Sequence, residues 1–362
     1  MQQAIAKRER IFYLDLIRVV ACFFVVMMHA SLKNYDVLIG STEFNIYVLI
    51  FNISSKLFFM ISGALLLPVR REPRQFVTRR LRAVLIPLAV WSIVYFIEML
   101  VFGSPSKDEI KRTLLSVPFT PVEGALWFVY VMVGFYLIMP LVSRCIEAID
   151  RRWIEYYLVL WLLSGITPFI NGVFYTEVFH HTMLASTCNF LGYIILGYYL
   201  HRYEPPIFSR ANILKSAAVI AVICIGLPLL VLTYQAEYYM PDPSDQLATI
   251  THDLGINTMV TGIVIFSVLQ HLSKRFACGD GNGKSALRKS ITNISICSFG
   301  IYLCHMLVYR HVVWQYIYGM GEAYSVHPLL LDVLCALTCF AVCYAIVSAI
   351  RILPFSRYMI GH

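Results

Sequence analysis

Three ionisable residues lie within the long apolar stretch near the amino terminus, residues 11–31. Asp15, Arg18 and His29 share one helix face, because eleven steps of about 100° bring His29 to within about 20° of Arg18, and Asp15 lies about 40° from His29. An imidazole accepts or donates a proton near neutral pH, and a neighbouring carboxylate and guanidinium set the charge around it. The spacing therefore predicts a single stripe of acid, guanidinium and imidazole, about three to four turns tall.

The helix that carries these residues is long enough to cross a bilayer. A hydrocarbon core of about 30 Å needs about 20 residues at a rise of about 1.5 Å per residue, and the stretch 11–31 supplies that length. Ionisable groups at such depth are costly in lipid, so they usually face a protein interior, a water-filled cavity or a site. We therefore expect the polar face of this helix to point into a bundle of further helices.

The composition is that of a multi-span membrane protein. Hydrophobic residues make up 59% of the 362 residues and charged residues 14%, and the mean hydropathy is +0.70. A soluble domain of ordinary composition is less apolar. The net charge of +8 does not indicate nucleic-acid binding, because the basic residues fall in short loops between apolar runs, where membrane topology accounts for them.

Ten apolar segments divide the chain, so the predicted fold is an all-α bundle of about ten transmembrane helices. The segments cover residues 11–31, 44–67, 83–102, 125–142, 154–171, 182–200, 213–234, 252–272, 293–313 and 328–353. Of the 29 lysines and arginines, 22 lie on the side of the two termini and only 4 in the alternate loops, which predicts that both termini are cytoplasmic. No linker, repeat or change of composition interrupts the chain, so we expect a single integral membrane domain over residues 1–362.

No metal site is predicted. The ten cysteines lie mostly inside the predicted spans and form no CxxC pair, and the histidine pairs lack further ligands at metal spacing. Cys335, Cys339 and Cys343 recur every four residues, which is more typical of small packing residues on one helix face.

Two features of the second predicted span have alternative interpretations. Ser62 and Gly63, in the sequence FFMISG, form either a notch for close helix packing or one wall of a channel beside the first span. Lys56 lies near the middle of the span and needs a buried partner or a water-filled cavity. A role in a site and a structural ion pair are both open for this lysine.

The densest basic patch is the predicted loop RREPRQFVTRRLR, residues 70–82. Membrane topology alone accounts for such a patch. A sharper interpretation is that Arg79 and Arg82, three residues apart, bind the phosphates of a cytosolic anionic cosubstrate through forked hydrogen bonds.

Four residues toward the outer side of the predicted bundle are further candidates for binding a substrate. Trp127 begins the fourth span, where aromatic residues also form the ordinary membrane-interface belt. The segment SFGIYLCH places His305 near mid-membrane, one turn beyond Tyr302, and such a histidine is either a structural hydrogen-bonding group or part of a site. Arg310 near the outer end either meets a substrate or extends to the interface.

Several stretches together resemble the membrane acyltransferase-3 family. LDLIRVVACFFVVMMHA matches the family's Arg-x10-His pattern at Arg18 and His29, FFMISG its second-span motif, and Arg79-x-x-Arg82 its basic motif. LWFVYVMVGFYLIMP is similar to its fourth-span segment, FLGYIILGYYLHR to its sixth, and SFGIYLCH to a segment near its end. Each piece alone is a weak signal, but they occur in the family's order over essentially the whole chain.

The resemblance implies an integral membrane O-acetyltransferase. Such proteins move an acyl group, commonly acetyl from cytosolic acetyl-CoA, to a hydroxyl of a sugar, polysaccharide or lipid at or across the membrane. The expected location is the cytoplasmic (inner) membrane of a bacterium. The expected partners are acetyl-CoA, a glycan or glycolipid acceptor and membrane lipids, and a homo-oligomer is compatible with this interpretation.

The expected site residues fall into three groups by role. The catalytic group is His29, Arg18 and Asp15, the group for acetyl-CoA is Arg79, Arg82, Ser62 and Lys56, and the group for the acceptor is Trp127, Tyr302, His305 and Arg310. Two positions depart from the family pattern. Lys56 stands where the family often has a small residue or proline, and Ala125 stands where histidine is frequent. Both departures bear on the acceptor more than on the type of reaction.

Two mechanisms and one rival function remain open at this stage. In the first mechanism His29 removes the acceptor proton, while the thioester arrives through a pore between the first, second and ninth spans. In the second, His29 carries the acyl group briefly as a covalent relay. The rival is a transporter that exports a polysaccharide or small anion along the same polar face. Many such carriers have a pair of spans that are interrupted by glycine or proline. The sequence lacks this feature, which disfavours transport.

Overall fold

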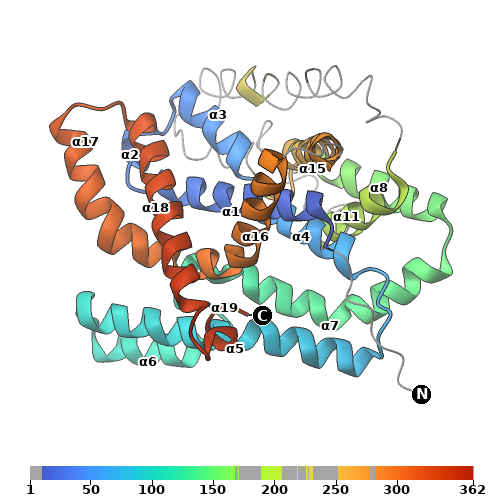
Figure 1. Ribbon diagram of the computed structural model, residues 1–362, viewed down its shortest axis with the longest axis horizontal. Helices are drawn as coiled ribbons and strands as arrows, with labels where there is room; N and C mark the ends of the chain where they lie inside the picture. Colours follow the sequence, from blue (N-terminus) through green and yellow to red (C-terminus); the bar gives the residue numbers. More distant parts are fainter. Residues whose placement is uncertain are drawn as a thin grey trace.

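A computed structural model of the chain describes residues 10–167, 189–205, 252–277 and 282–361, with single positions between 170 and 230. This part of the chain contains helices and loops and no strand, which confirms the all-α fold (Figure 1). The predicted span 182–200 is described from residue 189 onward and corresponds to α11, whereas most of the predicted span 213–234 lies outside the described residues.

The helices have well-defined bounds. They are α1 (Phe12–Ala30), α2 (Tyr35–Leu38), α3 (Thr42–Phe51), α4 (Ser54–Leu66), α5 (Pro73–Phe102), α6 (Lys107–Ser116), η1 (Gly124–Leu126), α7 (Trp127–Ala148), α8 (Arg151–Ser164), α11 (Leu191–Tyr203), α15 (Ile256–Ala277), α16 (Asn282–Val308), η4 (Tyr309–Tyr318), α17 (Gly319–Ala323), α18 (Pro328–Ile350) and α19 (Ser356–Ile360).

Seven helical segments within the described residues are long and apolar enough to cross a membrane. They are Phe12–Ala30, Thr42–Leu66, Pro73–Phe102, Gly124–Ala148, Ile256–Lys274, Ala286–Gly321 and Pro328–Ile350. The predicted span 154–171 corresponds to α8, which is only 14 residues long. The count of about ten spans and the side on which the termini lie therefore stay predictions.

Helix α1 lies at the centre of the bundle. It contacts α4, α15, α16 and α18 (Figure 1). Helix α16 runs parallel to it, because Ser295 meets Arg18 near one end of α1 and His305 meets His29 near the other. Helix α18 runs antiparallel to α16, since Cys339 donates to the His305 carbonyl and Arg351 reaches back to Cys297. The polar face of α1 therefore points toward α16.

Helices α4 and α11 pack so closely that two glycines are required. A Cβ added at Gly63 would lie 1.8 Å from the Ile194 carbonyl oxygen, and one at Gly197 would lie 2.0 Å from that of Met60. Small residues let membrane helices approach at backbone distance. Gly63 thus serves as the packing notch, while its neighbour Ser62 faces the other way, into a cavity described below.

Helix α5 begins earlier than the sequence indicated. The predicted loop 70–82 is helical from Pro73 onward, because Pro73 occupies the first turn and the Glu72 carboxylate accepts hydrogen bonds from the backbone N–H groups of Arg74 and Gln75. The basic residues are therefore held on a helix, and the prediction of a loop was wrong for most of this stretch.

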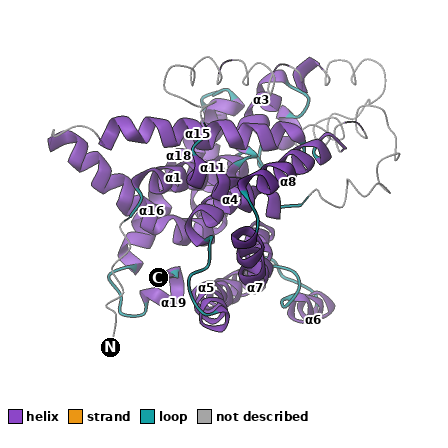
Figure 2. Cartoon of the chain, turned by 90° about the vertical axis from the view of Figure 1, so that its right-hand side faces the viewer, coloured by secondary structure: helices purple, strands orange, loops and turns teal. Residues whose placement is uncertain are grey.

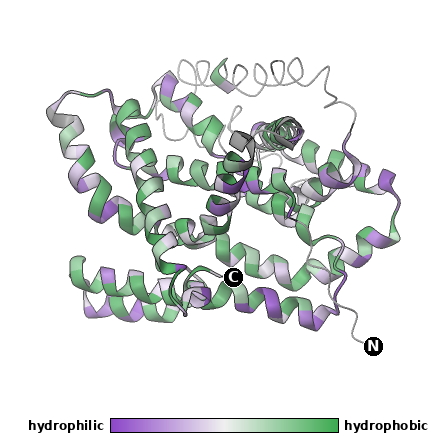
Figure 3. Cartoon of the chain, viewed as in Figure 1, coloured by the Kyte–Doolittle hydropathy of each residue, from purple (hydrophilic) through white to green (hydrophobic). Residues whose placement is uncertain are grey.

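Helices α5 and α7 lie side by side at one edge of the bundle (Figure 2). Their outward faces carry large exposed apolar side chains, namely Leu85, Ile86, Ile93, Ile97, Leu100, Val101, Phe102, Leu137, Ile138 and Leu141. Hydrophobic residues line most of each helix, with hydrophilic residues mainly near helix ends and in loops (Figure 3). An apolar surface of this extent fits contact with lipid.

Candidate active site

The amino-terminal half of the predicted polar stripe forms a small network around Asp15. This carboxylate is only 4% exposed. Its Oδ1 atom accepts from Arg18 Nη1 at 3.2 Å, from Arg10 Nη2 at 2.9 Å and from the Ser295 hydroxyl at 2.7 Å. Arg18 also donates to the Ser295 Oγ atom at 3.0 Å. Buried charges need such partners, so Asp15 orients Arg18 and balances its charge.

The other half of the stripe brings two histidines together. The ring centroids of His29 and His305 lie 5.0 Å apart, with the planes inclined by 42°. His305 is fully buried, and its Nδ1 atom lies 2.6 Å from the Tyr302 carbonyl oxygen. A carbonyl only accepts, so Nδ1 carries the proton and Nε2 is left as an acceptor. That Nε2 atom is buried and has no hydrogen-bond partner among the described residues.

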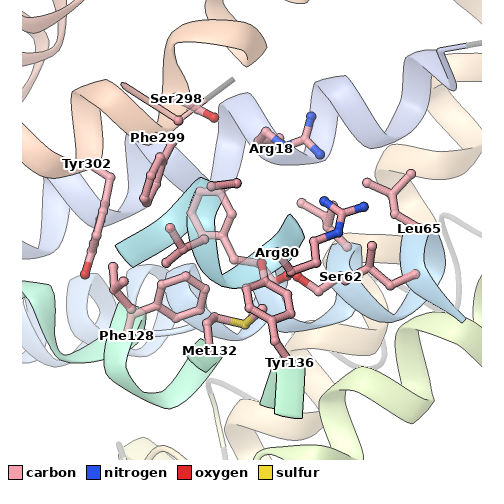
Figure 4. Close-up of a pocket in the computed structure, with 17 residues that line it drawn as sticks. Arg18, Ser62, Leu65, Arg80, Phe128, Met132, Tyr136, Ser298, Phe299 and Tyr302 are labelled. Atoms are coloured by element: carbon pink, nitrogen blue, oxygen red, sulfur yellow. Dashed lines mark hydrogen bonds between the residues drawn. The ribbon is translucent and has the colours of Figure 1, made fainter. Parts of the chain in front are cut away.

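A cavity of about 250 Å³ lies between α1, α4, α5, α7 and α16. Arg18 and Arg80 lie at one end of it and Tyr302 at the other (Figure 4). Its walls between these ends are mostly apolar, formed by Phe58, Ile61, Ser62, Leu65, Leu66, Ala83, Val84, Phe128, Val129, Met132, Tyr136, Ser298 and Phe299, with Gly361 beside Arg80. The cavity is therefore mostly apolar, with cationic groups at one end.

A larger basic groove of about 1330 Å³ adjoins this cavity. Arg80, Ala83 and Gly361 border both spaces, and we call this shared boundary the neck. Among the described residues, six arginines line the groove, namely Arg71, Arg74, Arg79, Arg80, Arg82 and Arg357, and the one acidic residue along it is Glu72, which caps α5. The excess of positive charge suits a ligand with several phosphates.

His29 lies beyond the far end of the cavity. Tyr302 lines the cavity, its ring centroid lies 5.9 Å from that of His305, and His305 in turn adjoins His29. The Tyr302 hydroxyl donates to the Ala125 carbonyl oxygen at 2.5 Å, which holds the ring across this end. The structure thus brings Arg18, Ser62 and Tyr302 to the cavity, with His305 and His29 in line behind it.

Lys56 lies elsewhere. It is 2% exposed, and its Nζ atom contacts the Asp253 carboxylate at 2.5 Å and the Asn52 carbonyl oxygen at 2.7 Å. It is not among the residues that line the cavity or the groove. A buried ammonium group takes the nearest carboxylate, so the geometry favours the ion-pair alternative over a role in binding the cosubstrate.

The remaining acceptor-side candidates are held by other contacts. Arg310 donates to both oxygens of Glu98, at 3.0 and 3.1 Å, and to a carboxylate oxygen of Glu123. The Trp127 ring packs against Phe128 and Phe190. Neither Arg310 nor Trp127 lines the cavity, whereas Phe128 does.

The sequence analysis missed Arg80 and the residues of α19. Arg80 lies between the two arginines of the basic motif, but it continues the buried stripe of α5 that runs through Val84, Pro87 and Trp91. This helical spacing could have indicated Arg80 if the helix had been predicted to begin at Pro73. No sequence pattern indicated that α19 would fold back against α5.

The comparison with protein families identifies the class of protein. The family model of the acyltransferase domain matches residues 11–348, which is nearly the whole chain. The chain therefore belongs to the acyltransferase-3 family, as the motifs predicted, and with its apolar helices it is an integral membrane acyltransferase. Comparisons with curated proteins and with solved structures found no match.

Proposed function

We propose that the protein transfers an acetyl group from cytosolic acetyl-CoA to a hydroxyl of a sugar, polysaccharide or glycolipid at or across the inner membrane of a bacterium. The observation that carries this proposal is the arginine-rich groove that adjoins an apolar cavity at the neck, where the proposal requires a passage. CoA has the matching shape and charge, with phosphates at one end and a thin pantetheine arm that ends in the thioester.

The phosphates bind in the groove, where Arg79 and Arg82 meet them with forked, charge-assisted hydrogen bonds. The pantetheine arm passes the neck beside Arg80 and lies along the apolar walls. Ser62 faces this arm, and its hydroxyl is occupied in part by a hydrogen bond to the Phe58 carbonyl at 2.8 Å. The thioester then lies toward Tyr302, on the side of the two histidines.

His29 supplies the proton chemistry in either of two balanced routes. In direct transfer, the acceptor hydroxyl gives its proton to His29 while its oxygen bonds to the thioester carbonyl carbon. The carbon–sulfur bond then breaks, and the CoA thiolate takes the proton from the imidazolium. In a relay, a ring nitrogen of His29 bonds to that carbon, and the thiolate leaves with the ring proton. The acceptor oxygen then takes the acyl group and returns its proton to the ring.

His305 acts on His29 in direct transfer. A histidine that has taken up a proton carries N–H groups on both ring nitrogens, and the second needs an acceptor. The unpartnered Nε2 atom of His305 is such an acceptor, on a ring whose centroid lies 5.0 Å from that of His29. His305 is thus proposed as a positioning residue for His29 as well as a neighbour of the acceptor.

Tyr302 stands between the thioester and His29, so it must move for transfer to occur. Its ring is held by a single side-chain hydrogen bond, from its hydroxyl to the Ala125 carbonyl. Turning the ring about its side-chain bonds breaks that bond and joins the cavity to the histidine pair. Tyr302 therefore acts as the gate between the donor and the acceptor side.

Labelled acetyl-CoA separates this proposal from the transporter alternative. The purified chain is incubated with acetyl-labelled acetyl-CoA and a glycan or glycolipid acceptor, and label is followed on protein and acceptor. The proposal expects label on the acceptor with wild-type protein and none with His29→Ala. The matched control is His327→Ala, since this histidine is exposed at the start of α18. Absence of label from wild-type protein, together with flux of an anion or glycan across vesicles, would favour transport.

A further inference from the structure

The short helix α19 lies beyond residue 348, where the family match ends, yet it is built firmly into the bundle. Ile360 is 1% exposed, and its side chain packs where a Cβ on Gly300 of α16 would sit. The Trp91 Nε1–H group of α5 donates to the Met359 carbonyl at 2.8 Å. These contacts fix α19 against α5 and α16.

This position places α19 along the proposed path of the donor. Arg357, Tyr358 and Gly361 line the basic groove, and Gly361 also lines the apolar cavity. Gly361 has a φ of +65°, and a Cβ there would lie 2.6 Å from the Ala83 carbonyl oxygen of α5. A side chain would therefore collide with α5, so glycine lets the end of α19 pack this closely against it.

Arg357 adds a positive charge to the groove from α19, an element separate from α5 and its arginines. It is exposed, and its Nη2 atom donates to the Tyr358 hydroxyl at 2.7 Å. The guanidinium also lies over the Tyr358 ring, 4.8 Å from the centroid. Tyrosine is a neutral partner, so the contact orients the guanidinium and leaves its charge available to an anion.

We propose that α19 is the second wall of the donor-nucleotide site, in which Arg357 binds a phosphate of CoA together with the arginines of α5. This inference rests on the proposed function, because it assumes that the groove holds the nucleotide of the donor. It adds a residue that lies outside both the basic motif and the matched range of the family. The groove then binds the phosphates from two separate elements, which fixes the direction in which the pantetheine arm enters the neck.

The test measures CoA binding to the purified full chain by calorimetry. Arg357→Ala should raise the Kd of CoA about ten-fold or more, as expected for the loss of a charge-assisted hydrogen bond. Arg357→Lys, which keeps the charge, should raise it less. The matched control is Arg144→Ala, because Arg144 is an exposed arginine on α7 away from the groove. Transfer from acetyl-pantetheine, which lacks the nucleotide, should proceed equally in wild-type and Arg357→Ala proteins.

The outcomes distinguish this inference from the proposed function. If Arg357→Ala bound CoA as tightly as wild-type protein while the double substitution of Arg79 and Arg82 by alanine weakened binding, α19 would not be part of the site and the inference would be overturned. If wild-type protein did not bind CoA at all, both the inference and the proposed function would be wrong.

Discussion

His29 and His305 face each other across the interface of α1 and α16, with their ring centroids 5.0 Å apart. The hydrogen bond from Nδ1 of His305 to the Tyr302 carbonyl fixes its tautomer, so its buried Nε2 atom is an acceptor. A buried acceptor without a partner lowers the stability of the fold, so we expect it to have a partner in another state of the molecule. Protonated His29 provides that state.

His29→Ala should lower acetyl transfer by about 100-fold or more, because general base and nucleophilic roles contribute at least that much. The affinity for CoA should stay within about two-fold of wild type, since His29 does not line the cavity or the groove. Turnover with saturating acetyl-CoA and calorimetric binding of CoA measure the two effects. A variant that retained most of its turnover would show that another group does the chemistry.

His305→Asn tests the histidine pair with little change to the fold. The amide N–H of asparagine can still donate to the Tyr302 carbonyl, but the Nε2 acceptor of the ring is lost. We expect turnover to fall about ten-fold and the KM for acetyl-CoA to stay unchanged, with a shift in the pH profile of turnover. A purely structural role of His305 would instead lower the melting temperature and leave the pH profile in place.

Arg79 and Arg82 are expected to act on donor binding alone. Replacing both with alanine removes two of the six arginines along the groove, so the KM for acetyl-CoA should rise by about 10- to 100-fold while turnover at saturation is retained. The effect should weaken at high salt, because the groove is open to solvent. Equal KM values for the double variant and wild-type protein would refute their role.

The two residues of the Lys56–Asp253 pair should differ in how much their replacement lowers the free energy of unfolding. Asp253→Asn leaves a lysine that is 2% exposed without its counter-charge, and should cost about 2 kcal/mol, below the usual range for a buried pair because Asp253 is 40% exposed. Lys56→Met removes the buried charge itself and should cost less. Denaturation of the purified protein in detergent measures both. Lys56→Met should leave the affinity for CoA unchanged. A loss of CoA affinity in this variant would show that Lys56 is part of the donor site.

The sequence predicted those features that depend on one helix alone. The shared face of Arg18 and His29 follows from helical spacing, and the structure places both on the side of α1 that meets α16. The basic stretch before the third span was also visible, although the cap at Glu72 that makes it helical was overlooked. Each of these features is local, so residue order is sufficient to find it.

Features that depend on which helices become neighbours were beyond the sequence. Lys56 meets Asp253 across nearly two hundred residues, so the choice between an ion pair and a site could not be made from either residue alone. The return of α19 to α5, through the bond from Trp91 to Met359, is equally non-local. For the same reason, Arg80 could be assigned to the neck only after Gly361, which also borders it, was placed.

The most direct test of the account is an experimental structure of the purified chain with bound acetyl-CoA. The account predicts phosphates between α5 and α19, the pantetheine arm through the neck at Arg80, and the thioester between Arg18 and Tyr302. Acetyl-CoA bound elsewhere, with the apolar cavity filled by side chains or lipid, would contradict it.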